Sequence, residues 1–147
     1  MSAGFKIVRD DRDKGFQNLP ISSITVVLDD LLELVAGATA WTLVTSSSDH
    51  FTRKAVAKAG ASTAATEVSA IELDGTEIVE VQSANASDTS HNGDRMAATD
   101  ENTVNNSGTD VSGQAAVFVQ KSTVGATTDN RILGNVLVGN GVDPDAA

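Results

Sequence analysis

The stretch between residues 92 and 137 constrains the fold most, because short aliphatic segments alternate in it with runs of Asn, Asp, Ser, Thr and Gly. Short Val- and Leu-bearing segments favour β-strands. The polar runs favour loops, since their side chains hydrogen-bond to nearby backbone and tolerate tight turns. The pattern predicts short strands over residues 94–99, 103–105, 115–120 and 131–138. It carries no obvious chemical motif and points to a structural module rather than an enzyme.

The first half of the chain adds further strand-forming segments. By their β-branched and aliphatic content, strands are predicted over residues 24–28, 38–47 and 51–60, the last of them exposed. The run DDLLELVAG between them leaves two alternatives. Asp29 would cap a two-turn helix that ends at Gly37, or LLELV would form a strand, which we favour because β-rich segments flank it. Trp41 is predicted to anchor the core.

The clearest local signal is the run VSAIELDGTEIVEV, in which two β-rich segments flank Asp74–Gly75. Asp-Gly suits a two-residue type I′ turn, so the run predicts a β-hairpin. The register would pair Leu73 with Thr76, Ile71 with Ile78 and Val68 with Val81. Both faces of the hairpin are apolar, which predicts burial on two sides or coverage by a partner. Glu72 and Glu77 would face each other near the turn, in water.

Residues 1–20 are predicted to form an extended N-terminal arm, followed by a β domain over residues 21–138 and a flexible tail over residues 139–147. Pro20 marks the boundary, because proline fixes its own φ and biases the preceding residue toward extended backbone. Apolar side chains in the arm need a surface to pack on, either that of their own domain or that of a neighbouring subunit. For the second case the contact residues would be Phe5, Ile7, Val8, Phe16 and Leu19.

Composition narrows the possible partners. The net charge is −10, with +1 on the first fourteen residues and −11 on the other 133, so an acidic body follows a mildly basic arm. An acidic surface repels phosphate backbones and anionic lipids, so neither nucleic acid nor a membrane is expected as a partner. No apolar signal segment is visible, and the most apolar window, residues 24–44, contains three carboxylates.

Motifs for catalysis, cofactors or metals are not found. The chain has no Cys and two histidines, His50 and His91, both in polar loop contexts. There is no nucleophile elbow, P-loop or dinucleotide fingerprint. The segment from Asp88 to Gly93 imitates the first half of a calcium loop, but Thr99 stands where the bidentate Glu is required. We therefore expect no catalytic residue, no cofactor and no specific metal site.

The C-terminal half carries a family resemblance. GDRMAATDENTVNNSGTD, followed by AVFVQKST and TTDNRILGNVL, resembles the C-terminal barrel region of tailed-bacteriophage head decoration, or cement, proteins. The resemblance lies in the order of a Gly-Asp strand start, a polar loop, an aliphatic strand and a closing strand, and residues 21–46 match more loosely. It implies a small β-barrel that binds the outside of a mature capsid between major capsid subunits and associates with itself as a trimer or dimer.

The combined expectation is an all-β protein, a small tulip-like β-barrel or a sandwich with an extended N-terminal arm, located on the capsid outer surface of a virion. It would stabilise the shell by bridging copies of the major capsid protein. Two alternatives remain: a structural component of the phage tail, neck or fibre, and a carbohydrate-binding β module.

Overall fold

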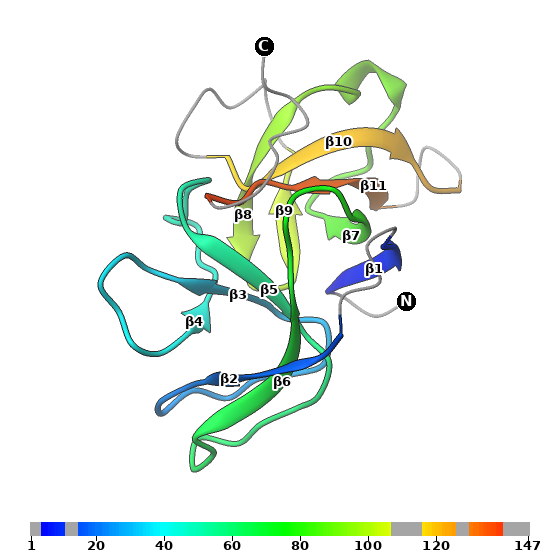
Figure 1. Ribbon diagram of the computed structural model, residues 1–147. Helices are drawn as coiled ribbons and strands as arrows, with labels where there is room; N and C mark the ends of the chain where they lie inside the picture. The colour runs from blue at the N-terminus through cyan, green and yellow to red at the C-terminus, as the bar shows by residue number, and fades with distance from the viewer. Residues whose placement is uncertain (1–3, 11–14, 107–115, 126–129, 140–147) are drawn as a thin grey trace.

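The computed structural model describes residues 4–10, 15–106, 116–125 and 130–139 of the chain (Figure 1). It is nearly all-β, with 48% strand and 3% helix, which confirms the predicted fold class. The described elements, in chain order, are β1 (Phe5–Arg9), β2 (Gln17–Pro20), β3 (Leu31–Leu34), β4 (Thr42–Leu43), β5 (Arg53–Ala57), β6 (Glu67–Glu72), β7 (Ile78–Ser83), the 3-10 turn η1 (Thr89–His91), β8 (Arg95–Asp100), β9 (Thr103–Asn105), β10 (Phe118–Thr123) and β11 (Arg131–Val136).

A closed five-stranded barrel forms one part of the molecule, in the upper half of Figure 1. Its strands follow the order β7, β11, β10, β8 and β9, and β9 returns to β7 in parallel, with Gln82 opposite Thr103 and Ser83 opposite Val104. Closure removes the open sheet edges that invite pairing with other chains.

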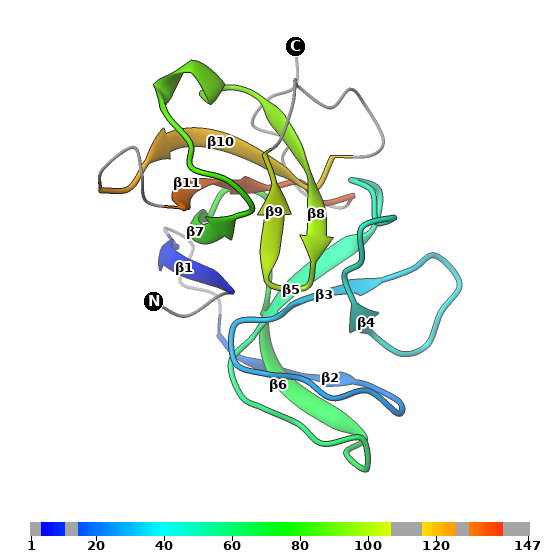
Figure 2. The same cartoon turned by 180° about the vertical axis from the view of Figure 1, so that it is seen from behind.

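The N-terminal strand belongs to the same sheet. β1 runs antiparallel to β7, with Phe5 opposite Val81 and Ile7 opposite Val79. β9 pairs with the second half of that edge of β7, and β1 pairs with the first half (Figure 2). An extended arm separate from the body is therefore not confirmed over residues 5–9, because this segment is a strand of the barrel sheet.

A half-barrel forms the other part of the molecule. Its strand order is β2, β6, β5, β3 and β4. The two ends of this sheet approach each other, because the amide of Trp41 donates to the carbonyl of Pro20 at 2.8 Å and Ile21 forms a parallel bridge with Trp41. Residues 17–20 of the predicted arm thus form an edge strand of this sheet.

The central strands of the half-barrel are buried on both faces. On β3, Leu31 belongs to the barrel core and Leu32 to the half-barrel core. On β5, Val56 belongs to the barrel core and Ala55 to the half-barrel core. Successive strand residues point to opposite faces, so two neighbouring apolar residues serve two cores. This explains why the strand over residues 51–60, predicted to be exposed, is instead almost wholly buried in β5.

The predicted hairpin at Asp74–Gly75 is wrong. β6 pairs with β2 and β5 in the half-barrel, whereas β7 pairs with β1 and β11 in the barrel, so the turn carries the chain from one sheet to the other. The two strands do not pair with each other, because each is already paired along both edges with strands of its own sheet.

The carboxylate of Glu77 holds this turn together. It accepts hydrogen bonds from the amides of Asp74, at 3.1 and 3.2 Å, and of Gly75, at 3.1 Å. Asn135 of β11 donates to the carbonyls of Gly75 and Glu77. Glu77 is 1% exposed, contrary to the expectation that it faces water, because its oxygens replace water as partners of the turn amides. Glu72 pairs instead with Arg53 at 2.7 Å.

Other strand predictions have mixed outcomes. The strands expected over residues 94–99, 103–105 and 131–138 appear as β8, β9 and β11, and LLELV forms β3 as favoured. The predicted strand over residues 24–28 keeps only a bridge from Val26 to Ala61, and the one over residues 38–47 is reduced to Thr42–Leu43. β10 begins at Phe118, and residue 115 lies outside the described residues. Trp41 is buried, as predicted.

Replacing Glu77 with Ala should lower the free energy of unfolding by about 1–3 kcal/mol, because the buried amide of Gly75 and the partly buried amide of Asp74 lose their acceptor. Glu77→Gln keeps one side-chain oxygen and should lose less. Urea denaturation measures both changes. The matched control is Glu67→Ala at the exposed first residue of β6, which should change stability by no more than about 0.5 kcal/mol. Equal effects of Glu77→Ala and Glu67→Ala would contradict this account of the turn.

Candidate interaction surface

The five predicted contact residues divide into buried and exposed groups. Phe5 is fully buried and meets Phe118 edge to face at a centroid distance of 6.4 Å, while Leu19 is buried in the half-barrel core. Ile7 is partly buried against the barrel core. Val8 and Phe16 are 50% and 67% exposed. The first two therefore anchor the N-terminal segment to its own chain, and the last two face solvent.

Local geometry explains why the N-terminal segment docks where it does. The amide of Gly4 donates to the carbonyl of Asn102, and that of Phe5 donates to the carbonyl of Asp29, at 2.9 and 2.8 Å. Gly4 has φ of +128°, and a Cβ at this position would lie 2.8 Å from the Cβ of Asp29. Only glycine suits this close approach, so Gly4 sets the place at which β1 begins.

A group of carboxylates lies beside this junction. Asp30 is 3% exposed, and burial raises its pKa to about 6, with further increases from the nearby charges of Glu101, Asp100 and Asp29. The hydrogen bond from the amide of Val27 to Asp30, at 2.9 Å, acts in the opposite direction.

A second polar group lies where β3 and β5 meet the segment 45–52. Glu33 accepts hydrogen bonds from the hydroxyls of Ser48 and Thr52 and is 6% exposed. Beneath it, the fully buried ammonium of Lys54 donates to the carbonyls of Asp49 and Leu137, at 2.7 and 3.0 Å. Burial lowers the pKa of Lys54 to about 8, and the charges of Glu33 and Asp49 partly oppose this.

Sequence reasoning missed this group because Glu33 and Lys54 are adjacent only through strand pairing, with Glu33 of β3 opposite Lys54 of β5. A signal was present in the chain, since each of these charges interrupts an apolar strand segment. Charged residues in such positions are seldom buried without a partner.

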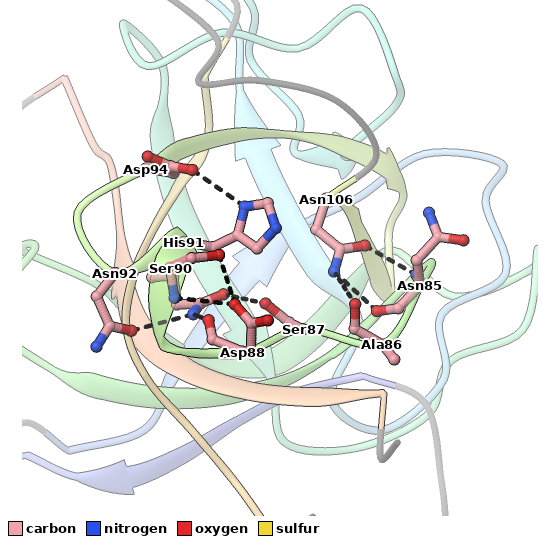
Figure 3. A network of polar contacts seen from close by, with 10 residues as sticks. Asn85, Ala86, Ser87, Asp88, Ser90, His91, Asn92, Asp94 and Asn106 are labelled. Carbon is pink, nitrogen blue, oxygen red and sulfur yellow. Dashed lines mark hydrogen bonds and ion pairs between the residues drawn. The ribbon is translucent and has the colours of Figure 1, made fainter. Parts of the chain in front are cut away.

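The loop after β7 is fixed by a third polar network (Figure 3). The fully buried amide of Gln120 accepts from the hydroxyl of Ser87 at 2.7 Å and donates to the carbonyl of Asp88 and to Oδ1 of Asn92. Asn106 holds the start of this loop through the amide and carbonyl of Asn85. The network gives the polar loop a defined shape.

Hydrogen bonds within the chain also occupy the side-chain oxygens of the segment from Asp88 to Gly93, which imitates the first half of a calcium loop. Oδ1 of Asp88 accepts from the amide of Ser90 at 2.9 Å, as in a helix N-cap, and Oδ1 of Asn92 is bonded to Gln120. These oxygens are thus used within the chain. Among the residues that the structure describes, no group of three or more His, Cys, Asp or Glu side chains could hold a metal ion.

The two histidines each contact a side chain close to them in the chain. His91 Nδ1 lies 3.1 Å from a carboxylate oxygen of Asp94, three residues along the same loop. His50 packs edge to face on Phe51 at 4.2 Å. Both are partly buried rather than fully exposed.

Four further apolar side chains face solvent and were not predicted as contact residues. They are Val27, Leu28, Val35 and Phe51, with exposed fractions between 48% and 61%. Val35 and Phe51 lie in one hollow of about 260 Å³, whose wall also includes Arg53. The sequence pattern did not find them, because it assigns aliphatic runs to strands and to the core.

The raised pKa of Asp30 predicts a pH effect on stability. A carboxyl group whose pKa is higher in the folded than in the unfolded state stabilises below the unfolded value and loses that contribution as pH rises through the folded value. Asp30→Asn should therefore stabilise the protein by about 1–2 kcal/mol more at pH 7.5 than at pH 4. Thermal or urea unfolding across this range measures the difference. Glu67→Gln is the control, and a pH-independent effect of Asp30→Asn would contradict the prediction.

Comparison with known proteins found no matching family model, no matching curated protein and no matching solved structure. No helix among the described residues has both the length and the apolar character needed to cross a membrane.

Proposed function

We propose that this chain is a structural virion protein that binds the outer surface of a phage capsid and stabilises it by bridging major capsid subunits. The observation that carries the proposal is the arrangement of the N-terminal segment. Phe5 and Leu19 anchor it in the barrel and in the half-barrel, and between them Val8 and Phe16 are held in solvent. Apolar side chains that are fixed before binding lose little entropy when they meet a partner.

The proposed contact combines apolar burial with strand addition. Among the described strands β1 pairs with β7 alone, and we propose that an extended segment of a capsid subunit adds along its other side, beyond the hydrogen bond from the amide of Phe5 to Asp29. Many copies of such a contact, repeated over a symmetric shell, bind strongly without any single strong site. The order of strands and polar loops between residues 92 and 137, which resembles that of head decoration proteins, supports the same proposal.

Deleting residues 1–19 would not be a clean test, because the deletion removes β1 and β2 from the two sheets. Point substitutions in the exposed side chains separate binding from folding. The double variant Val8→Ser/Phe16→Ser should reduce binding to capsids by more than tenfold, because burying two apolar side chains contributes about 3 kcal/mol or more. Cosedimentation with purified heads that lack the protein measures the occupancy.

The matched control is Phe51→Ala, which removes an exposed aromatic side chain outside the N-terminal segment and should leave capsid occupancy unchanged. Thermal unfolding checks that both variants are folded. Wild-type occupancy of the folded double variant would refute the proposed contact. Loss of occupancy in Phe51→Ala alone would place the capsid contact elsewhere on the molecule.

A further inference from the structure

A polar hollow of about 220 Å³ opens beside β3, at the segment that leads from β4 to β5. Four hydroxyl and two carboxylate side chains line it: Thr45, Ser47, Ser48, Thr52, Glu33 and Asp49. The described side chains around it thus offer many hydrogen-bond acceptors, together with hydroxyls that act as donors or acceptors.

Internal hydrogen bonds fix several of these groups in place. The buried carboxylate of Glu33 is held by the hydroxyls of Ser48 and Thr52. Ser48 also accepts from the amide of Thr45 at 3.0 Å, and a carboxylate oxygen of Asp49 accepts from the amide of Phe51 at 2.8 Å. A ligand would therefore meet polar groups that are already oriented, which lowers the cost of binding.

The negative charge of this hollow is partly balanced from within the chain. The ammonium of Lys54 is buried next to the hollow, and its charge acts on both Glu33 and Asp49. The protein thus supplies its own positive charge at this place. The carboxylate oxygens of Glu33 and Asp49, whose negative charge is partly balanced in this way, can still accept hydrogen bonds from hydroxyl groups of a ligand.

An apolar wall continues from the polar hollow. Val35 is 48% exposed and lines both this hollow and the neighbouring one of about 260 Å³. The second hollow contains the 59%-exposed ring of Phe51, which His50 contacts edge to face. A ring held in this way offers a flat apolar surface next to a group of polar side chains.

We propose that the two adjoining hollows form a binding site for a saccharide. A pyranose ring has hydroxyl groups on its rim and an apolar C–H face, which match the polar hollow and the ring of Phe51. The site would recognise one sugar unit of a glycan or polysaccharide. This inference does not depend on capsid binding, because it uses different side chains.

The test is a titration of the isotope-labelled full chain with the methyl glycosides of glucose, galactose, mannose and N-acetylglucosamine, followed by NMR. At least one glycoside should shift the amide signals of residues 33–35 and 45–52, with a dissociation constant in the millimolar range. Phe51→Ala should weaken this binding by about tenfold, which is the effect expected from losing one aromatic contact. Ser47→Ala, which removes an exposed hydroxyl of the hollow, should also weaken it.

Phe16→Ala is the matched control, since it removes an equally exposed ring from another part of the chain and should leave sugar binding unchanged. The proposal is overturned if none of the four glycosides shifts these signals, or if Phe51→Ala and Phe16→Ala bind alike. It is also overturned if calcium ions alone produce the same shifts at lower concentration than any glycoside. Phe16 is substituted as the test residue in the capsid experiment and as the control in the sugar experiment, and the reverse holds for Phe51. Either proposal can therefore fail without the other.

Discussion

One edge of β7 has more backbone hydrogen-bonding groups than the three-residue strand β9 can satisfy. β9 covers only Gln82 and Ser83, and the rest of that edge would be left unpaired above the barrel core. β1 fills this place and brings the ring of Phe5 against Phe118. Buried backbone groups need partners, so the position of the N-terminal segment follows from the shortness of β9.

Strands of the half-barrel also contribute to the barrel core. The strands β3 and β5 place alternate residues in two different cores, so the half-barrel has no free side on which β3 and β5 meet water. The inter-sheet turn at Asp74–Gly75 is then held from the barrel side, by Glu77 just before β7 and by Asn135 of β11. Charged and polar residues at the remaining junctions, Lys54 and Asp30 among them, satisfy backbone groups where the sheets meet.

Local patterns predicted a substantial part of this fold. The strands β8, β9 and β11 follow from short aliphatic segments between polar loops, and β3 follows from LLELV. The hairpin prediction failed, because turn chemistry at Asp-Gly shows that the chain turns but not which strands then pair. Apolar character on both faces of the flanking strands was the contrary signal, and it indicated two separate sheets.

The candidate sites were less predictable for a related reason. Phe5 and Phe16 look alike in sequence, yet one is buried and the other 67% exposed, since burial depends on the distant partners Val81 and Phe118. The hollow at Glu33 is formed by β3 and a segment that follows it by more than ten residues. Neither arrangement has a local sequence pattern that would specify it.

The central feature of the molecule is that β1 is an integral strand of the barrel sheet and presents Val8 to solvent. Amide hydrogen exchange in β1 tests this most directly, because residues 5–7 are paired with β7 and the N–H of Phe5 donates to the carbonyl of Asp29 beneath a fully buried side chain. We predict protection close to that of the central barrel strand β11, as expected for an amide that exchanges only on global unfolding. Exchange at the rate of an unstructured peptide would contradict the account and restore the picture of a free N-terminal arm.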